Sequence, residues 1–115
     1  MPLKNHLKKE KEKVFEYIDT HKAEIIQFLS DYIKIKSVTP NELEVQRWLK
    51  EKFEEMGFDK VDYWAVDEKG VRPNVVATVK GRGNGRSLIL NGHSDTVPVH
   101  EEQLKDWFTD PWTPV

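Results

Sequence analysis

The sequence predicts an α/β fold in which helices pack on a mixed β-sheet. Three segments with helical spacing of apolar residues come first, and three short segments typical of strands follow them. This order of helices and then strands indicates a layered arrangement, with helices covering one or both faces of the sheet. A chain of 115 residues has room for one small domain of this kind.

The first two predicted helices differ in how apolar they are. Apolar residues from Leu3 to Ile18 keep a roughly helical spacing in a background rich in Lys and Glu. The charges in Lys8–Lys13 alternate in sign, so we interpret this run as a solvated helix face rather than a basic patch. A second helix, Thr20–Ile35, is expected to be capped at its start by Asp19 or Thr20. Its wider apolar stripe predicts packing against the sheet.

The third predicted helix, Pro40–Met56, has the clearest local signals. Thr39 can cap it, the proline suits its first position, and Glu42 can reach back to complete a capping box. Gly57 supplies a left-handed residue that ends the helix, and Phe58 can fold back on the last turn. The expected buried stripe consists of Val45, Trp48, Leu49, Phe53 and Met56.

Three strands are predicted after the helices. The first, Val61–Ala65, alternates apolar and polar residues, and the second, Asn74–Lys80, is rich in β-branched residues. The third, Ser87–Leu90, is apolar on both faces, as expected of a strand in the middle of a covered sheet. The glycine-rich residues 81–86 open a strand and not a helix, so we interpret them as a hairpin connection rather than a phosphate-binding loop.

The composition narrows the classes of function. Eighteen basic and 20 acidic residues give a net charge of −2, which does not favour nucleic acid as a partner. No apolar run approaches the length of a membrane span, and the N-terminus lacks the apolar stretch of a secretory signal, so we expect a cytoplasmic protein with no membrane partner. Because there is no cysteine, any metal must be held by imidazole and carboxylate groups.

The residues best suited to chemistry follow the predicted third strand. His93 and Asp95 are two positions apart, so an extended backbone directs both side chains to the same side. Asp95 can then accept a hydrogen bond from one imidazole nitrogen and leave the other deprotonated for a divalent metal. Ligand sites in open α/β sheets gather beyond the carboxyl ends of strands, where this pair is expected. Ser94 would point to the opposite side, which argues against a Ser-His-Asp triad.

The pair His93 and Asp95 is a weak signal by itself. Such a pair occurs by chance, and a hydrogen-bonded histidine in a capped turn is its usual explanation. One histidine also cannot hold zinc, which takes three or four ligands. The other histidines are poor partners, because His6 and His21 are expected on surface helices and His100 in a solvated loop.

Asn91–Pro98 (Asn-Gly-His-Ser-Asp-Thr-Val-Pro) resembles the first metal-binding signature of a family of zinc peptidases. This family includes acetylornithine deacetylase, succinyl-diaminopimelate desuccinylase, aminoacylase and glutamate carboxypeptidase. Further segments that agree with its pattern are Ile35–Pro40, Glu54–Phe58, Asn74–Ala77 and Asp106–Trp112, where Trp112 replaces the usual Phe.

The resemblance implies a metal-dependent hydrolase of amide bonds, acting on small-molecule N-acyl-amino acids or small peptides. It makes His93 a metal ligand and Asp95 the residue that orients it. Zinc is the expected metal, in a site that holds two ions when complete, and cobalt or manganese are alternatives. In such a site the metals polarise the amide carbonyl and activate a bridging water, and a Glu takes its proton.

The resemblance also identifies residues 1–115 as the N-terminal portion of a metallopeptidase catalytic domain, without the family's dimerisation domain. We therefore expect an incomplete α/β domain that is inactive alone, and a homodimer only for the full-length parent. Two alternatives remain open at this point. One is a standalone non-catalytic α/β module that binds a metal or a protein, and the other is a domain whose likeness to the family is only structural.

Overall fold

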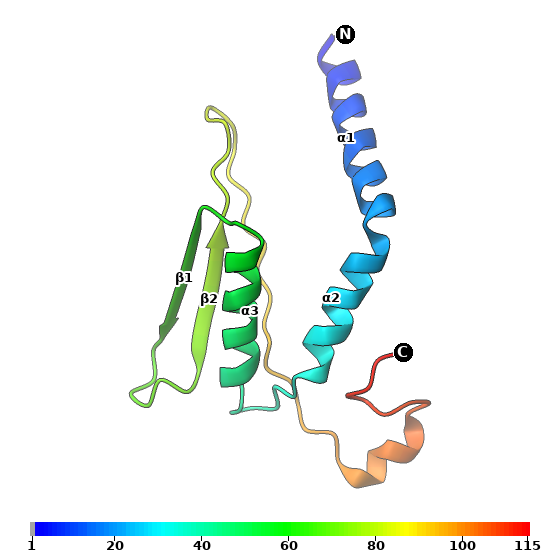
Figure 1. The fold of residues 1–115 in the computed structure, drawn as a ribbon, viewed down its shortest axis with the longest axis vertical. Coiled ribbons are helices and arrows are strands. Elements are labelled where there is room, and N and C mark those ends of the chain that lie inside the picture. Colours follow the sequence, from blue (N-terminus) through cyan, green and yellow to red (C-terminus); the bar gives the residue numbers. More distant parts are fainter. Residues whose placement is uncertain (1) are drawn as a thin grey trace.

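A computed structural model describes residues 2–115, with side chains from residue 6 onward. Figure 1 shows an open arrangement in which three helices are followed by a pair of strands, which confirms the predicted order of these elements. The elements are α1 (Pro2–Thr20), α2 (Lys22–Lys34), α3 (Leu43–Glu55), β1 (Lys60–Ala65), β2 (Pro73–Thr78) and the short 3-10 helix η1 (Glu101–Asp106). The side chain of Leu3, part of the first predicted apolar stripe, lies outside the described residues.

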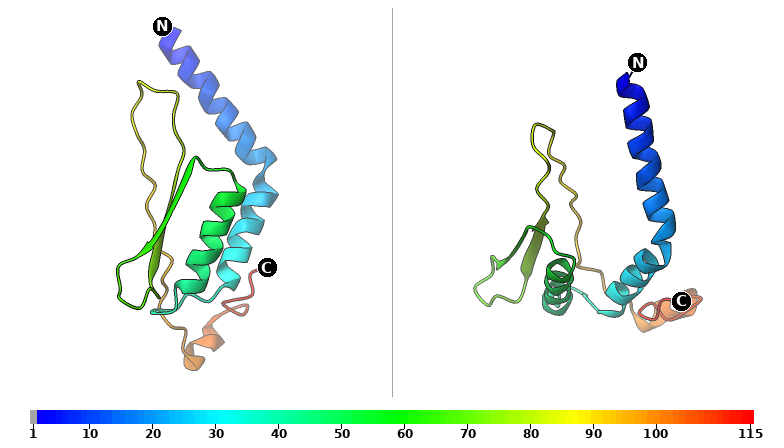
Figure 2. Two further views of the ribbon diagram at one scale, coloured as in Figure 1. Left: turned by 60° about the vertical axis from the view of Figure 1, so that its left-hand side comes forward. Right: turned by 45° about the horizontal axis from the view of Figure 1, so that its top comes forward.

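Helix α1 projects away from the other elements, and α2 continues from its end at an angle (Figures 1 and 2). Lys13 and Glu10 approach to 2.9 Å on the exposed surface of α1, which confirms the solvated face of alternating charge. His21 separates the two helices, and its Nδ1 lies 2.8 Å from the carbonyl oxygen of Tyr17. The predicted cap is wrong, because the Thr20 hydroxyl donates back to the Glu16 carbonyl at 2.7 Å instead of capping α2.

Helix α2 packs on α3 and not on the sheet, which corrects the prediction made for Thr20–Ile35. The rings of Phe28 and Tyr32 lie 4.9 and 6.1 Å from the ring of Trp48 on α3. Helix α3 is the one that contacts both strands (Figure 2). One helix, α3, is enough to cover one face of a two-stranded sheet. The apolar side chains of α2 that do not contact α3 therefore stay about half exposed.

Helix α3 begins at Leu43, three residues later than predicted, and the expected capping box is absent from its start. The backbone N–H of Thr39 donates to Thr96 at 3.2 Å, so this residue is engaged with a distant segment. The carboxylate of Glu42 bonds Arg72 instead of the backbone. At the other end the predictions are confirmed: Gly57 has a φ of 74°, and the ring of Phe58 lies 5.3 Å from that of Phe53. Met56, predicted to be buried, is exposed.

Strands β1 and β2 pair antiparallel, from Lys60 opposite Thr78 to Ala65 opposite Pro73, which confirms the first two predicted strands. The third prediction is wrong, since Ser87–Leu90 forms no strand and its three apolar side chains are 81–88% exposed. A strand that is apolar on both faces needs a neighbour on each edge and a cover on each face. The two described strands and one helix do not provide this, and the segment returns past α3 without joining the sheet (Figure 1).

The buried residues gather near the start of α3. Val45 is the only fully buried apolar side chain among the described residues. Three polar residues are nearly as inaccessible, with 4% of Ser37, 4% of Glu42 and 7% of Ser94 exposed. The best-packed part of the structure therefore surrounds the segment that carries His93 and Asp95. None of the described helices is both long and apolar enough to cross a membrane.

Candidate metal-binding site

The segment that carries His93 and Asp95 is fixed by backbone contacts, although it is not part of a strand. The N–H of Thr96 donates to the carbonyl of Ser37 at 3.1 Å, and the N–H of Thr39 donates to the carbonyl of Thr96 at 3.2 Å. These two bonds form an isolated parallel bridge between Val38 and Thr96. His93 therefore does not lie at the carboxyl end of a central strand, as predicted, but three residues before a point where the chain is tied to the loop ahead of α3.

Ser94 is the buried residue of this segment. Its carbonyl accepts a 2.6 Å hydrogen bond from the Ser37 hydroxyl, and its Oγ accepts a 2.8 Å bond from Nε2 of Gln46 on α3. The phenol of Tyr32 on α2 also faces it. Burial raises the pKa of Tyr32, and a hydrogen bond with Ser94 opposes that rise only in part. The loop ahead of α3 and α3 itself therefore both hold this serine.

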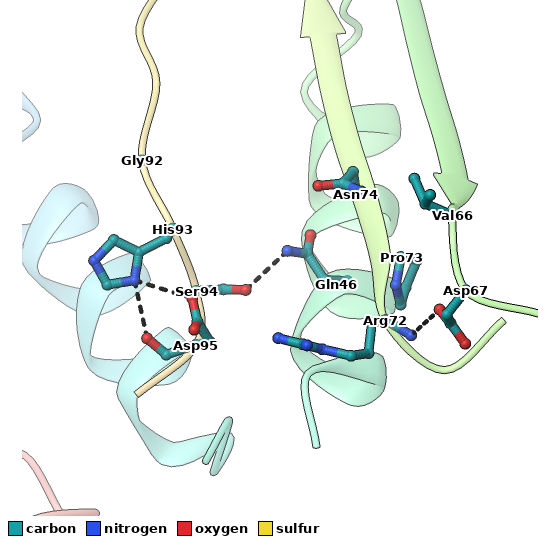
Figure 3. A pocket seen from close by; sticks show the side chains of 10 residues that line it. All are labelled: Gln46, Val66, Asp67, Arg72, Pro73, Asn74, Gly92, His93, Ser94 and Asp95. Atoms are coloured by element: carbon teal, nitrogen blue, oxygen red, sulfur yellow. Dashed lines mark hydrogen bonds and ion pairs between the residues drawn. The ribbon is translucent and has the colours of Figure 1, made fainter. Parts of the chain in front are cut away.

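His93 and Asp95 lie on the side of the chain opposite to Ser94. Figure 3 shows the Ser94 side chain directed towards Gln46 while the imidazole and the carboxylate leave together in the other direction. This confirms the predicted alternation and leaves no Ser-His-Asp triad, because Ser94 does not reach the imidazole ring.

The predicted contact between His93 and Asp95 is confirmed. Nδ1 of His93 lies 3.1 Å from Oδ1 of Asp95 and 2.9 Å from the carbonyl oxygen of the same residue. With both neighbours being acceptors, the proton belongs on Nδ1 and the lone pair on Nε2. The imidazole is 83% exposed, so Nε2 is open to solvent. The Thr39 hydroxyl donates to the other carboxylate oxygen, Oδ2, over a long 3.4 Å.

An ion pair between the buried Glu42 and the half-exposed Arg72 lies beside this segment and was not predicted from the sequence. Nε and Nη2 of Arg72 donate to the two carboxylate oxygens of Glu42 at 3.2 and 3.0 Å, and this pairing raises the pKa of Arg72. Asp67 accepts the N–H groups of Val71 and Arg72 at 3.0 and 2.9 Å, which lowers the pKa of its carboxyl group. The turn between β1 and β2 is thereby linked to the residue that precedes α3.

Two open hollows meet at the predicted pair. One, of about 490 Å³, is lined by Gln46, Val66, Asp67, Arg72, Pro73, Asn74, Gly92, His93, Ser94 and Asp95 (Figure 3). The other, of about 480 Å³, is lined by Thr39, His93, Asp95, Thr96, Val97 and Pro98. His93 and Asp95 line both hollows, so a ligand in either one can reach them.

The donor chemistry at this position fits one metal ligand with its supporting carboxylate. The Nδ1 proton faces Asp95 and the Nε2 lone pair faces solvent, as a metal-binding imidazole requires. Within residues 2–115 no three His, Asp or Glu side chains come together in a way that would hold an ion. His21 and His100 lie elsewhere, at the junction of α1 and α2 and ahead of η1.

Comparison with known proteins gives relatives that share most of this chain. The N-formyl-4-amino-5-aminomethyl-2-methylpyrimidine deformylase of Bacillus subtilis (strain 168) is 34% identical over 103 residues, covering 85% of this chain and 23% of that protein. Succinyl-diaminopimelate desuccinylase 2 of Ruegeria sp. (strain TM1040) is 32% identical over 92 residues, covering 80% and 22%. The succinyl-diaminopimelate desuccinylase of Buchnera aphidicola subsp. Acyrthosiphon pisum (strain APS) is 35% identical over 91 residues, covering 79% and 22%.

The chain is homologous to proteins of the family that its motifs resemble, among them two succinyl-diaminopimelate desuccinylases. It spans less than a quarter of the length of the relatives described above. No family model matches the chain, and no solved structure matches it. The names of these relatives describe removal of formyl or succinyl groups.

The sequence identified the two residues that face the hollows and missed those that support them. Ser37 lies in the segment Ile35–Pro40, whose pattern indicates only a likeness to the family, and the pattern around Glu42 predicts a helix cap. Gln46 occupies a helix position one turn after Glu42, where its N–H donates to the Glu42 carbonyl at 3.1 Å. Nothing in the local pattern distinguishes Gln46 from a solvated helix residue, because its partner is 48 positions away.

Proposed function

We propose that the protein is a metal-dependent hydrolase of amide bonds in N-acyl-amino acids or small peptides, in which His93 is a metal ligand and Asp95 orients it. The observation that carries this proposal is the 3.1 Å contact between His93 Nδ1 and Asp95 Oδ1, on an exposed imidazole that lines two hollows. Residues 1–115 are then the N-terminal portion of the catalytic domain. A small-molecule substrate is the proposed partner, and a homodimer is proposed only for a longer parent chain.

The roles of the protein groups follow from this geometry. Asp95 holds the proton on Nδ1, so the lone pair of the neutral imidazole lies on Nε2. Bound zinc, or cobalt or manganese in its place, would supply Lewis-acid activation of the amide carbonyl and of water. Thr39 donates to the carboxylate oxygen that His93 does not use, which limits rotation of Asp95. The larger hollow beside His93 is open enough to admit a small acylated substrate.

We further propose that residues 1–115 by themselves turn over no substrate. A catalytic zinc takes about three protein ligands and a water, and the family resemblance assigns one ligand, His93, to this chain. The test of the activity is therefore a chimera, in which the matched residues of this chain replace the corresponding segment of the Bacillus subtilis deformylase. We expect the chimera to release formate from the deformylase substrate when zinc or cobalt is present.

Variants of the chimera test whether His93 is the metal ligand. His93→Ala should abolish hydrolysis, while His21→Ala, a histidine of the same chain at the helix junction, should leave it within a few fold of the parent. Hydrolysis that survives His93→Ala would contradict the assigned ligand. A folded, metal-loaded chimera without activity would contradict the hydrolase function and favour a non-catalytic metal- or protein-binding module.

A further inference from the structure

The polar groups of Ser94 are hydrogen-bonded to residues far away in the sequence. These bonds bear on the direction of the adjacent His93 and Asp95 side chains. The Ser37 hydroxyl holds its carbonyl at 2.6 Å, and the Gln46 amide holds its Oγ at 2.8 Å. Both are short bonds for their type; the bond from Ser37 is buried and the bond from Gln46 is partly buried. A buried hydrogen bond is costly to lose, because the remaining partner stays desolvated and unpaired.

The direction of the metal-binding pair depends on this serine. Successive side chains of an extended segment alternate, so fixing Ser94 inward fixes His93 and Asp95 outward. No strand partner performs this function here, since residues 86–95 lie outside the two-stranded sheet. The contacts of Ser94 and the bridge at Thr96 are what hold the segment to the helices.

Gln46 is itself held in a defined place. The ion pair between Glu42 and Arg72 anchors the residue ahead of α3, and Gln46 follows one helical turn later. Its Nε2 donates to Ser94 while its Oε1 is buried with no partner among the described residues. A buried amide with a single hydrogen bond carries a desolvation cost, which the bond to Ser94 offsets.

We infer that Gln46 and Ser37 are positioning residues for the metal-binding pair and act through Ser94. Neither is proposed as a metal ligand, and their effect on the metal is exerted through His93 and Asp95. By fixing Ser94 they hold the His93 imidazole against the Asp95 carboxylate, in the tautomer and the direction that a metal needs. This inference rests on the proposed role of His93 as a ligand.

The first test measures metal affinity in the 115-residue protein by calorimetry with zinc. Gln46→Met keeps the length of the side chain and removes the donor, and Ser94→Ala removes the acceptor. Each should weaken zinc binding about 10-fold, the lower end of the range for lost supporting contacts. The double variant should be no weaker than either single variant, because both changes break one bond. The matched control is Gln27→Met on the exposed surface of α2, where the Gln27 amide donates to Asp31, and it should leave affinity unchanged.

The second test reads the geometry without metal. Nitrogen-15 NMR of the imidazoles at about pH 8, where histidine is neutral, distinguishes a proton fixed on Nδ1 from one exchanging between the two nitrogens. We expect a fixed Nδ1 proton on His93 in the parent and a mixture in Ser37→Ala, Gln46→Met and Ser94→Ala. Ser94→Thr retains the hydroxyl and should restore the parent signal. If Ser94→Ala does not fold, Gln46→Met and Ser94→Thr still test whether the hydrogen bond between Gln46 and Ser94 fixes the Nδ1 proton of His93.

The two possible failures are distinguishable. If His93→Ala leaves zinc binding unchanged, the proposed ligand is wrong and the positioning inference is overturned with it. If His93→Ala abolishes zinc binding while Gln46→Met and Ser94→Ala change neither the affinity nor the His93 signals, the ligand stands and the positioning inference alone is overturned. Strict additivity in the double variant would also overturn it, because the two side chains would then not act through one bond.

Discussion

Truncation of Val45 should destabilise the protein more than its small size suggests. Val45 is fully buried at the start of α3, next to Gln46. Val45→Ala removes two buried carbons, about 1.6 kcal/mol at about 0.8 kcal/mol for each, and the cavity adds roughly 1 kcal/mol. We therefore expect the free energy of unfolding to fall by about 2 to 3 kcal/mol, a large share of the stability of a small domain.

The assay is urea unfolding followed by far-ultraviolet circular dichroism, comparing midpoints at constant slope. The matched control is Val66→Ala, the same substitution at a side chain that is 83% exposed, which should change the stability by less than about 0.5 kcal/mol. Equal losses in the two variants, or a loss below about 0.5 kcal/mol for Val45→Ala, would refute the conclusion that the core is concentrated at the start of α3.

Three further predictions concern the turns and the site. The pKa of Asp67 is lower in the folded state than in the unfolded state. The ionised Asp67 carboxylate therefore stabilises the turn fully above the unfolded pKa of about 3.9. This stabilisation is lost as the pH falls through the pKa of the folded state. The amide signal of Val71 should report this loss, and Asp67→Asn should remove the transition. Gly57→Ala places a side chain at a φ of 74° and should lower the free energy of urea unfolding by about 1 to 2 kcal/mol. The control Gly81→Ala meets no close neighbour and should leave the free energy of unfolding nearly unchanged. Asp95→Ala in the active chimera should lower turnover by one to two orders of magnitude, and unchanged turnover would remove its proposed role.

Local signals predicted most of the secondary structure. The helical periodicity of α1, α2 and α3, the left-handed Gly57 and the alternation in β1 all depend on neighbours within a few residues. The start of α3 could not be predicted this way. Thr39 and Glu42 have the chemistry of a capping box, but their side chains bond Asp95 and Arg72, which are 56 and 30 positions away.

In the segment Ser87–Leu90, by contrast, the local pattern predicts an element that does not form. Its composition is that of a central strand, yet a strand forms only where partner strands are available on its edges. The described residues leave it exposed. The contact of His93 with Asp95 was predictable because it is set by two-residue alternation, whereas the support from Ser37 and Gln46 depends on tertiary structure. The cytoplasmic location, the identity of the metal and the choice of substrate stay predictions.

We propose that His93 binds a metal through Nε2 while Asp95 holds its Nδ1 proton. The most direct measurement is nitrogen-15 NMR of all the imidazoles during a zinc titration of the 115-residue protein. We expect the Nε2 signal of His93 to shift on zinc addition and its Nδ1 to stay protonated. The signals of His6, His21 and His100 should not move. Zinc-dependent shifts at one of those three histidines, with His93 unchanged, would contradict it.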